Sequence, residues 1–261
     1  MENEQLLKKR LAELYSRALA RAAYTNSDFL SLAEQNLVPP DALRFSHCAL
    51  LGGYDAAERR LAIFGSEGDC GYAAASPIAC IKISAKVAGA RHGAPPSSRI
   101  DLGIAGELSH RDILGALMSL GVKREALGDI VIQDNLAYLF CLESIAPYIC
   151  ENLVKSKHSP LSCELCDAPA LFLQKPPESF INIASERLDA LIAAVYKLSR
   201  ADAQRLFAQK LVFANGSEIQ SPNFTPEPGS MISVRGKGRF IYGGVSRETR
   251  KGRLCAEVRI Y

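Results

Sequence analysis

The sequence predicts an α+β fold in three parts, and the pattern of each part supports that prediction. Residues 1–77 are rich in helix-periodic segments, and residues 78–173 follow the order strand, helix, strand, strand, helix, strand. Residues 182–261 place two short helices before a β-rich tail. A chain of 261 residues is long enough for two or three compact domains. Its 48% apolar and 23% charged residues are typical of globular proteins.

The N-terminal domain, residues 1–77, is expected to be mostly helical. An amphipathic helix is predicted near its start by apolar residues at helical spacing: Leu7, Leu11, Leu14 and Ala18. Ser27 is expected to cap a second short helix, and the "VPP" at 38–40 to precede a third. In the segment "RRLAIF" at 59–64, apolar residues alternate with smaller or charged residues, which predicts a strand.

The middle domain, residues 78–173, shows the order of elements of a ferredoxin-like domain, the split β-α-β fold. Ser109 is placed to cap its first helix and Gly121 to end that helix. The segment "DIVIQDNLAYLFCLE" predicts two strands joined by a tight turn, and Ser144 is expected to cap the helix that follows. Many RNA-binding modules share this fold with unrelated proteins, so the fold does not decide the function.

Charge is distributed unevenly along the chain. Residues 185–261 hold 13 Lys and Arg against 7 Asp and Glu, whereas residues 1–184 hold 18 against 21. The C-terminal domain, residues 182–261, is therefore basic, and the remainder of the chain is slightly acidic. This asymmetry predicts an anionic partner that meets the C-terminal domain.

Several classes of protein are disfavoured by the sequence. No stretch of about 18 uninterrupted apolar residues occurs, so we expect no membrane span. The start of the chain is charged and helix-periodic, unlike a secretory signal. The eight cysteines are then most simply reduced thiols, which predicts a cytoplasmic protein.

Part of the C-terminal domain resembles a known RNA-binding module. The segment that runs from "RLD" at 187–189 through "SRADAQRLFAQKLVFANG", followed by "PGSMISV", is similar to the α/β module named after ribosomal protein S-four. Two upstream segments, "GGYDAAERR" at 52–60 and "LSHRDILGALMSLGVKREALGDI" at 108–130, resemble the bacterial YlmH family, which carries that module at its C-terminus.

The resemblance implies a ribosome-associated RNA-binding protein of the bacterial cytoplasm. Members of the family are linked to ribosome quality control, in which the large subunit carries a stalled peptidyl-tRNA. The partners implied are therefore ribosomal RNA and tRNA. Neither spacing nor charge indicates this step of translation, which comes from the resemblance alone.

The module's helices contain the first set of candidate RNA contacts. A helix N-terminus that also offers a hydroxyl and a guanidinium group suits a phosphate. Arg200 and Gln204 lie one turn apart and share a face of the second helix. The candidates in these helices are Arg187, Ser199, Arg200, Gln204, Arg205 and Lys210, and the middle domain adds His110 and Arg111.

The segment "RGKGRFIYGG" at 235–244 is predicted to continue the strand that runs through "MISV" at 231–234. Its three basic side chains would then share one face of the strand: Arg235, Lys237 and Arg239. A second basic group is expected to return along the same edge: Arg247, Arg250, Lys251 and Arg253. Phe240 is expected in the core, and Tyr242 is a candidate for stacking on an RNA base.

Some motifs resemble those of enzymes. The "HRD" at 110–112 lacks the other kinase motifs, so Asp112 is interpreted as a capping residue. The "RLD" at 187–189 resembles the catalytic strand of pseudouridine synthases, which makes an RNA-modifying enzyme the alternative function. Here it falls within a helix, so Asp189 is expected to be structural. In "ERR" at 58–60, a structural ion pair or a contact with a neighbouring domain is favoured over acid–base chemistry.

Cys163 and Cys166 form a single CxxC, whereas zinc sites use four ligands. In a strand, these two side chains would point to opposite faces. We therefore expect no metal and no cofactor. The leading interpretation is a non-enzymatic, monomeric RNA-binding protein, and a regulatory scaffold that binds a protein partner through residues 1–75 is a further alternative.

Overall fold

The computed structural model describes residues 2–85, 108–157, 159–169, 176–249 and 252–261. The chain divides into two compact units, Met1–Leu173 and Gln174–Tyr261, and both contain helices and strands. This mixed content agrees with the predicted α+β class. The division into three domains stays a prediction. Within the described ranges, no helix is both long enough and apolar enough to cross a bilayer.

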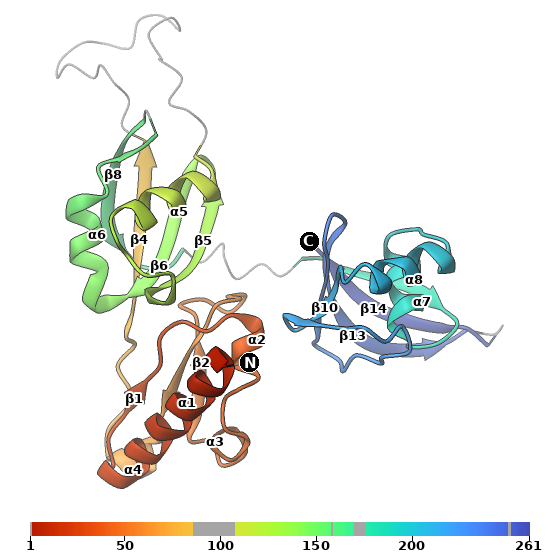
Figure 1. Cartoon of the computed structure of the whole chain (residues 1–261), viewed down its shortest axis with the longest axis horizontal. Helices are drawn as coiled ribbons and strands as arrows, with labels where there is room; N and C mark the ends of the chain where they lie inside the picture. The colour runs from red at the N-terminus through yellow and green to blue at the C-terminus, as the bar shows by residue number, and fades with distance from the viewer. Residues whose placement is uncertain (1, 86–107, 158, 170–175, 250–251) are drawn as a thin grey trace, which may run out of the picture. The chain divides into compact units, whose positions relative to one another are not determined.

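The first part of unit 1 combines helices with a small sheet (Figure 1). Strands β1, β3 and β2 form an antiparallel sheet in that order, against which α1 packs through Leu11 and Ala18. This sheet is larger than the one strand that the sequence predicts. The elements are α1 (Glu2–Arg21), β1 (Thr25–Asn26), α2 (Leu32–Gln35), α3 (Pro40–Arg44), β2 (Cys48–Leu51), β3 (Leu61–Phe64) and α4 (Glu67–Cys70).

The predicted cap at Ser27 is wrong. Helix α2 begins after Ser31, whose side chain accepts a hydrogen bond from the N–H of Glu34 in a capping box. Ser27 instead accepts a hydrogen bond from the N–H of Ala62 and donates one to the carbonyl of Asp28. Its hydroxyl is therefore used to join the segment before α2 to strand β3.

The second part of unit 1 is an antiparallel five-stranded sheet of order β5-β6-β4-β8-β7. Helices α5 and α6 pack on the sheet face that carries Ile81, Ile83 and Leu139. The elements are β4 (Ile78–Ala85), α5 (His110–Ser119), β5 (Leu127–Gln133), β6 (Leu136–Leu142), α6 (Ala146–Asn152), β7 (Lys155–Ser156) and β8 (Ser159–Cys166), with 3-10 turns at Arg124–Ala126 and Glu143–Ile145.

The predictions for the ends of α5 and for the start of α6 have different outcomes. Ser109 caps α5 by accepting a hydrogen bond from the N–H of Asp112, and Gly121 adopts φ 78° just after the helix, so both predictions are confirmed. The prediction for Ser144 is wrong. This residue lies inside the 3-10 turn Glu143–Ile145, and α6 begins after Ile145 without a side-chain cap.

Partly buried polar contacts connect the two parts of unit 1. The Arg59 side chain donates hydrogen bonds to the carbonyls of Phe29 (2.8 Å), Leu127 (2.9 Å) and Arg124 (3.3 Å). The carboxylate of Asp129 accepts hydrogen bonds from the Tyr54 hydroxyl and from the backbone N–H groups of residues 58 and 59. Arg59 of the "ERR" segment therefore joins the two parts of unit 1. The contact of this segment with a neighbouring domain stays a prediction, as does the division into domains.

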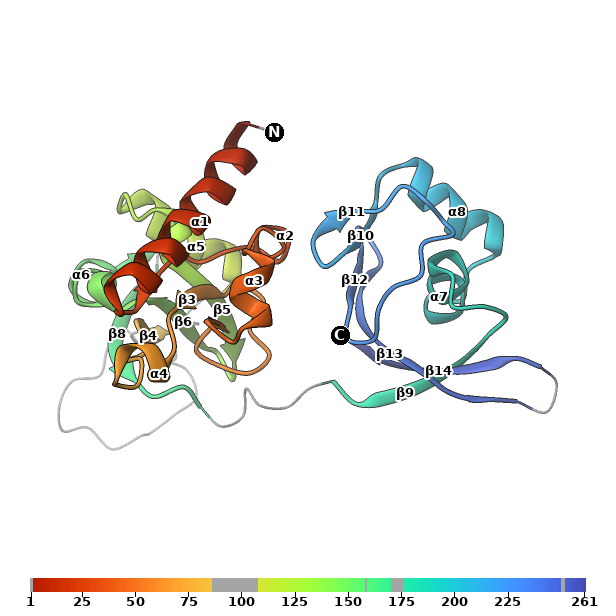
Figure 2. The ribbon, with the colours of Figure 1, turned by 90° about the horizontal axis from the view of Figure 1, so that it is seen from below.

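Unit 2 is a six-stranded antiparallel sheet of order β11-β10-β12-β13-β14-β9, with α7 and α8 packed on one of its faces (Figure 2). The core contains Leu191 and Phe207 of the helices and Phe240 of the sheet. The elements are β9 (Glu178–Ile183), α7 (Leu188–Val195), α8 (Arg200–Ala208), β10 (Val212–Ala214), β11 (Ser217–Glu218), β12 (Met231–Val234), β13 (Gly238–Glu248) and β14 (Leu254–Ile260).

Candidate nucleic-acid interface

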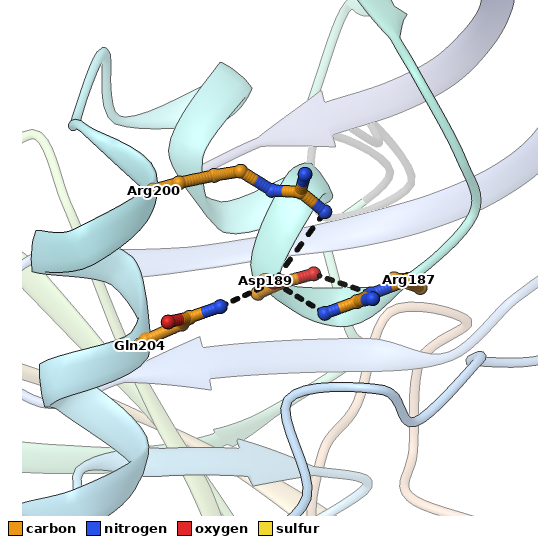
Figure 3. A network of polar contacts seen from close by, with 4 residues as sticks. All are labelled: Arg187, Asp189, Arg200 and Gln204. Atoms are coloured by element: carbon orange, nitrogen blue, oxygen red, sulfur yellow. Dashed lines mark hydrogen bonds and ion pairs between the residues drawn. The ribbon is translucent and has the colours of Figure 1, made fainter.

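A buried carboxylate brings three of the predicted contact residues together at the start of the helix pair (Figure 3). Asp189 is fully buried in the first turn of α7. It accepts hydrogen bonds from Arg187 at 3.1 Å (Nε) and 2.8 Å (Nη2), and from the Gln204 side chain at 3.2 Å. The Arg200 guanidinium lies 3.7 Å from the same carboxylate. Arg187, Arg200 and Gln204 therefore form one cluster on the α7–α8 surface.

The electrostatics of this cluster keep Asp189 ionised. Burial raises the pKa of Asp189, but hydrogen bonds from Arg187 and Gln204 and the charge of Arg200 outweigh burial, so its pKa lies below the usual value. The prediction that Asp189 is structural agrees with this arrangement. One carboxylate between two guanidinium groups leaves a net positive charge, and Arg200 remains more than half exposed.

Some of the groups near the N-terminus of α8 that the sequence offers to a phosphate already form contacts within the protein. Ser199 caps the helix and accepts a hydrogen bond from the N–H of Asp202. Its hydroxyl also donates to the Asp202 carboxylate at 2.6 Å, and Arg205 forms an ion pair with that carboxylate at 2.9 Å. Ser199 and Arg205 are therefore already engaged by one exposed acid.

The predicted continuous strand through "RGKGRFIYGG" is wrong. Strand β12 ends at Val234, residues 235–237 form a turn, and β13 begins at Gly238. Lys237 donates its N–H to the carbonyl of Val234 at 3.0 Å, with φ values of 78° at Gly236 and 122° at Gly238. These left-handed conformations suit glycine, so the alternating glycines reverse the chain into a hairpin.

The hairpin still gathers basic side chains. The N–H of Arg235 donates to the carbonyl of Leu211 at 2.9 Å, which places the turn beside exposed Lys210. The Arg235 guanidinium lies 4.6 Å from the centre of the Phe213 ring, and that of Arg239 lies 4.6 Å from the centre of the Tyr261 ring.

The prediction that Tyr242 stacks on a base is also wrong. Tyr242 and Phe240 are both fully buried in the core of unit 2, which confirms the inward position of Phe240. The Tyr242 hydroxyl donates a hydrogen bond to Glu186 at 2.5 Å. Burial and the neighbouring Glu186 carboxylate both raise the pKa of Tyr242. The aromatic ring is therefore inaccessible to a nucleic acid base.

The second basic group does not return along the same edge. Arg247 lies near the end of β13, and Arg253 just precedes β14, so both flank the far tip of the β13–β14 hairpin. A strand rises ~3.3 Å per residue, which separates the Cα atoms of Arg239 and Arg247 by roughly 26 Å. Figure 2 shows this hairpin extending beyond the rest of the sheet. Arg250 and Lys251 lie outside the described residues.

The remaining candidates lie on unit 1. His110 and Arg111 are exposed in the first turn of α5. Partial burial and the charge of Arg124 lower the pKa of His110, so its imidazole is neutral at neutral pH. The CxxC cysteines point to opposite faces as predicted: Cys163 packs against the helix-covered core, and Cys166 packs on the other face. Unit 2 presents one further exposed basic residue in its described part, Lys197 between α7 and α8, which no helical spacing marks in the sequence.

One family model matches the middle of the chain. Residues 106–168 match the family model described as "Putative RNA-binding domain in YlmH". This region includes His110 and Arg111, but its 5 Lys and Arg are outnumbered by 9 Asp and Glu. The most basic region of the chain therefore lies outside the matched residues.

A curated relative, the "Ribosome-associated protein quality control protein P2" of Bacillus subtilis, is 30% identical over 149 residues. The alignment covers 55% of this chain and 57% of the relative, little more than half of each. A solved structure, "Cell division protein ylmH from Streptococcus pneumoniae", gives a TM-score of 0.46 with 16% identity. It covers 63% of this chain and 91% of that chain, and a similarity this weak supports no further argument. The family model and the relative confirm the predicted resemblance: the chain is similar to proteins of the YlmH family.

Proposed function

We propose that this chain is a non-enzymatic RNA-binding protein that associates with the large ribosomal subunit carrying peptidyl-tRNA, in ribosome-associated quality control. The observation that carries the proposal is the Asp189-centred cluster, which orients Arg187, Arg200 and Gln204 on a strongly basic unit. Unit 2 holds 14 Lys and Arg against 8 Asp and Glu. Structured ribosomal RNA and tRNA offer the phosphates that such a surface binds.

The geometry supports phosphate binding in a specific way. Asp189 engages the Nε and one terminal nitrogen of Arg187, so the guanidinium has a defined orientation while the side chain remains 36% exposed. An oriented guanidinium loses less entropy when it binds a phosphate than a mobile one does. The turn at 235–237 adds Arg235 and Lys237, both exposed.

The comparisons support the same assignment. The B. subtilis relative is named for ribosome-associated quality control, and the family model for the middle region is named for RNA binding. We further propose that the chain acts in the cytoplasm as a monomer without a cofactor. The antiparallel order β5-β6-β4-β8 supports a ferredoxin-like middle domain, and the α7–α8 pair on its sheet supports the S-four-type module.

The alternative of an RNA-modifying enzyme receives no support from Asp189. Its carboxylate is fully buried and is engaged by Arg187, Gln204 and Arg200. A catalytic carboxylate of that class would have to reach a nucleotide, and this one is enclosed by its partners. The same contacts orient Arg187, Arg200 and Gln204, which form the proposed binding surface.

Co-sedimentation with purified large subunits at low salt tests the proposal. We expect the wild-type chain to sediment with subunits that carry peptidyl-tRNA, and Arg200→Ala with Lys237→Ala to reduce the bound fraction by about tenfold. The matched control is Lys9→Ala with Arg17→Ala, which removes two exposed charges from α1. Full retention of the test variant would contradict the assigned surface, and absence of wild-type binding would contradict the function.

A further inference from the structure

The sheet of unit 2 has one face without helices. Buried residues such as Val234, Phe240 and Val258 lie on the face that α7 and α8 cover. Their neighbours along each strand alternate to the opposite face. That opposite face, here called the open face, carries mostly half-buried or exposed side chains among the described residues, with Cys255 a buried exception.

Aromatic rings and guanidinium groups meet in one row of the open face. Phe213 of β10 pairs with Ser233 of β12, which pairs with Arg239 of β13. Tyr261 continues this row, because its N–H donates to the carbonyl of Arg239 at 3.1 Å. With strands ~4.8 Å apart, the row spans roughly 10 Å from Phe213 to Arg239.

The guanidinium group of an arginine lies over each aromatic ring of this row. Arg235 lies 4.6 Å from the ring centre of Phe213, and Arg239 lies 4.6 Å from that of Tyr261. Phe213 is only partly buried, and Tyr261 is 46% exposed. Each stack therefore presents a flat π surface beside a positive charge, and the two stacks lie side by side on a rigid sheet.

The opposite end of the open face differs in its balance of charge. Phe180 of β9 is 60% exposed, but its cross-strand neighbour is Glu257. Arg259 is neutralised there by Glu178 at 2.6 Å and by Glu257 at 3.4 Å. The Phe213–Tyr261 end of the open face therefore pairs two arginines with aromatic rings and has one acid, Glu218, opposite Phe213. The Phe180 end is charge-balanced, because its arginine, Arg259, is paired with two carboxylates.

We propose that the Phe213–Arg235 and Tyr261–Arg239 stacks bind unpaired RNA bases. Aromatic and guanidinium planes stack on any base, while the positive charge attracts the adjacent phosphates. A peptide partner would not require two ring–guanidinium pairs in register. The inference rests on the proposed RNA-binding function and extends it to a second surface, across the sheet from the Asp189 cluster, which recognises bases in addition to phosphates.

Fluorescence anisotropy with the full chain and two labelled probes tests this surface. One probe is an unstructured oligouridylate of about ten nucleotides, and the other is a blunt RNA duplex, whose base faces are hidden. Phe213→Leu with Tyr261→Leu should weaken oligouridylate binding by about tenfold or more, and change duplex binding by less than about twofold. The matched control, Phe180→Leu, removes an exposed ring from the charge-balanced end and should leave both affinities unchanged.

A single tryptophan provides a direct signal, because the chain contains none. Phe213→Trp keeps an aromatic plane at this position, so it should retain oligouridylate binding. A base stacked on the new indole should quench its fluorescence as the probe saturates. The duplex, bound elsewhere, should quench it little.

The outcomes separate the inference from the proposed function. Normal oligouridylate binding by Phe213→Leu with Tyr261→Leu, or saturation of Phe213→Trp without quenching, overturns the stacking surface alone. Binding of neither probe by the wild-type chain overturns both proposals. A change in self-association of the double variant, with RNA binding unchanged, would mean that the open face docks protein and that the inference is wrong.

Discussion

The two units of this chain use arginine in opposite ways. Unit 1 is slightly acidic, with 17 Lys and Arg against 20 Asp and Glu, whereas unit 2 has 14 against 8. In unit 1, Arg59 points inward and donates to three backbone carbonyls. In unit 2, Arg187 and Arg200 surround a buried carboxylate but remain accessible at the surface.

The difference shows that a count of basic residues does not identify a binding surface. Arg59 donates hydrogen bonds to partly buried carbonyls of both parts of unit 1, so its role is to hold unit 1 together. The arginines of unit 2 are oriented by Asp189 and still present charge to solvent. Substitutions should therefore affect stability in one unit and RNA affinity in the other.

The largest expected effect is at Arg59. Arg59→Ala removes three partly buried hydrogen bonds, although the Leu127 carbonyl keeps a second donor in Arg124. It should lower the free energy of unfolding of unit 1 by about 3 kcal/mol. Urea denaturation followed by circular dichroism measures this loss. Arg17→Ala, at an exposed position of α1, is the control and should change stability by less than about 0.5 kcal/mol. Equal stability of the two variants would remove the proposed contrast between the units.

Asp189 provides the next test. Asp189→Asn removes the charge that Arg187 and Arg200 share and should destabilise unit 2 by about 2 kcal/mol at neutral pH. Because the folded-state pKa lies below the usual value, the wild-type contribution is present above about pH 4 and is lost as the pH falls through the folded-state pKa. The stability difference between wild type and variant should therefore shrink in acid.

Glu218→Gln is the control for Asp189, since it neutralises an exposed carboxylate of the same unit. Its effect on stability should be small at every pH. A constant difference between wild type and Asp189→Asn from pH 7 down to pH 2 would contradict the ionised state of Asp189.

A smaller effect is expected at the hairpin turn. Arg235→Ala with Lys237→Ala should weaken RNA binding by about tenfold and reduce the slope of log affinity against log salt by roughly 2. Stability should change by less than about 1 kcal/mol, because both side chains are exposed. Titrations at several salt concentrations give the slope. The pair Lys9→Ala with Arg17→Ala should not alter it, and an equal change in both pairs would indicate a general charge effect.

The smallest effect concerns Tyr242. Tyr242→Phe removes the hydrogen bond to Glu186 and should cost about 1 kcal/mol of stability. RNA affinity should be unchanged, because the ring lies in the core. Thermal unfolding and anisotropy together measure the two quantities. A loss of affinity without a loss of stability would restore the stacking role that the burial of Tyr242 excludes.

Local chemistry made several elements predictable. Ser109 and Ser199 cap their helices because a hydroxyl before a helix satisfies a free N–H within three residues. The inward face of α8 follows from the spacing of Ala203, Leu206 and Phe207. The family resemblance was likewise readable from short segments of sequence.

Only the tertiary structure decided which side chains meet. Asp189 and Gln204 are 15 residues apart and become partners because α7 packs on α8. Tyr242 is buried because its position on β13 faces the helices, and Arg235 reaches Phe213 because β12 pairs with β10. The alternating glycines suit either a strand or a turn. The pairing of β12 with β10 and β13, which depends on residues distant in the sequence, selected the turn.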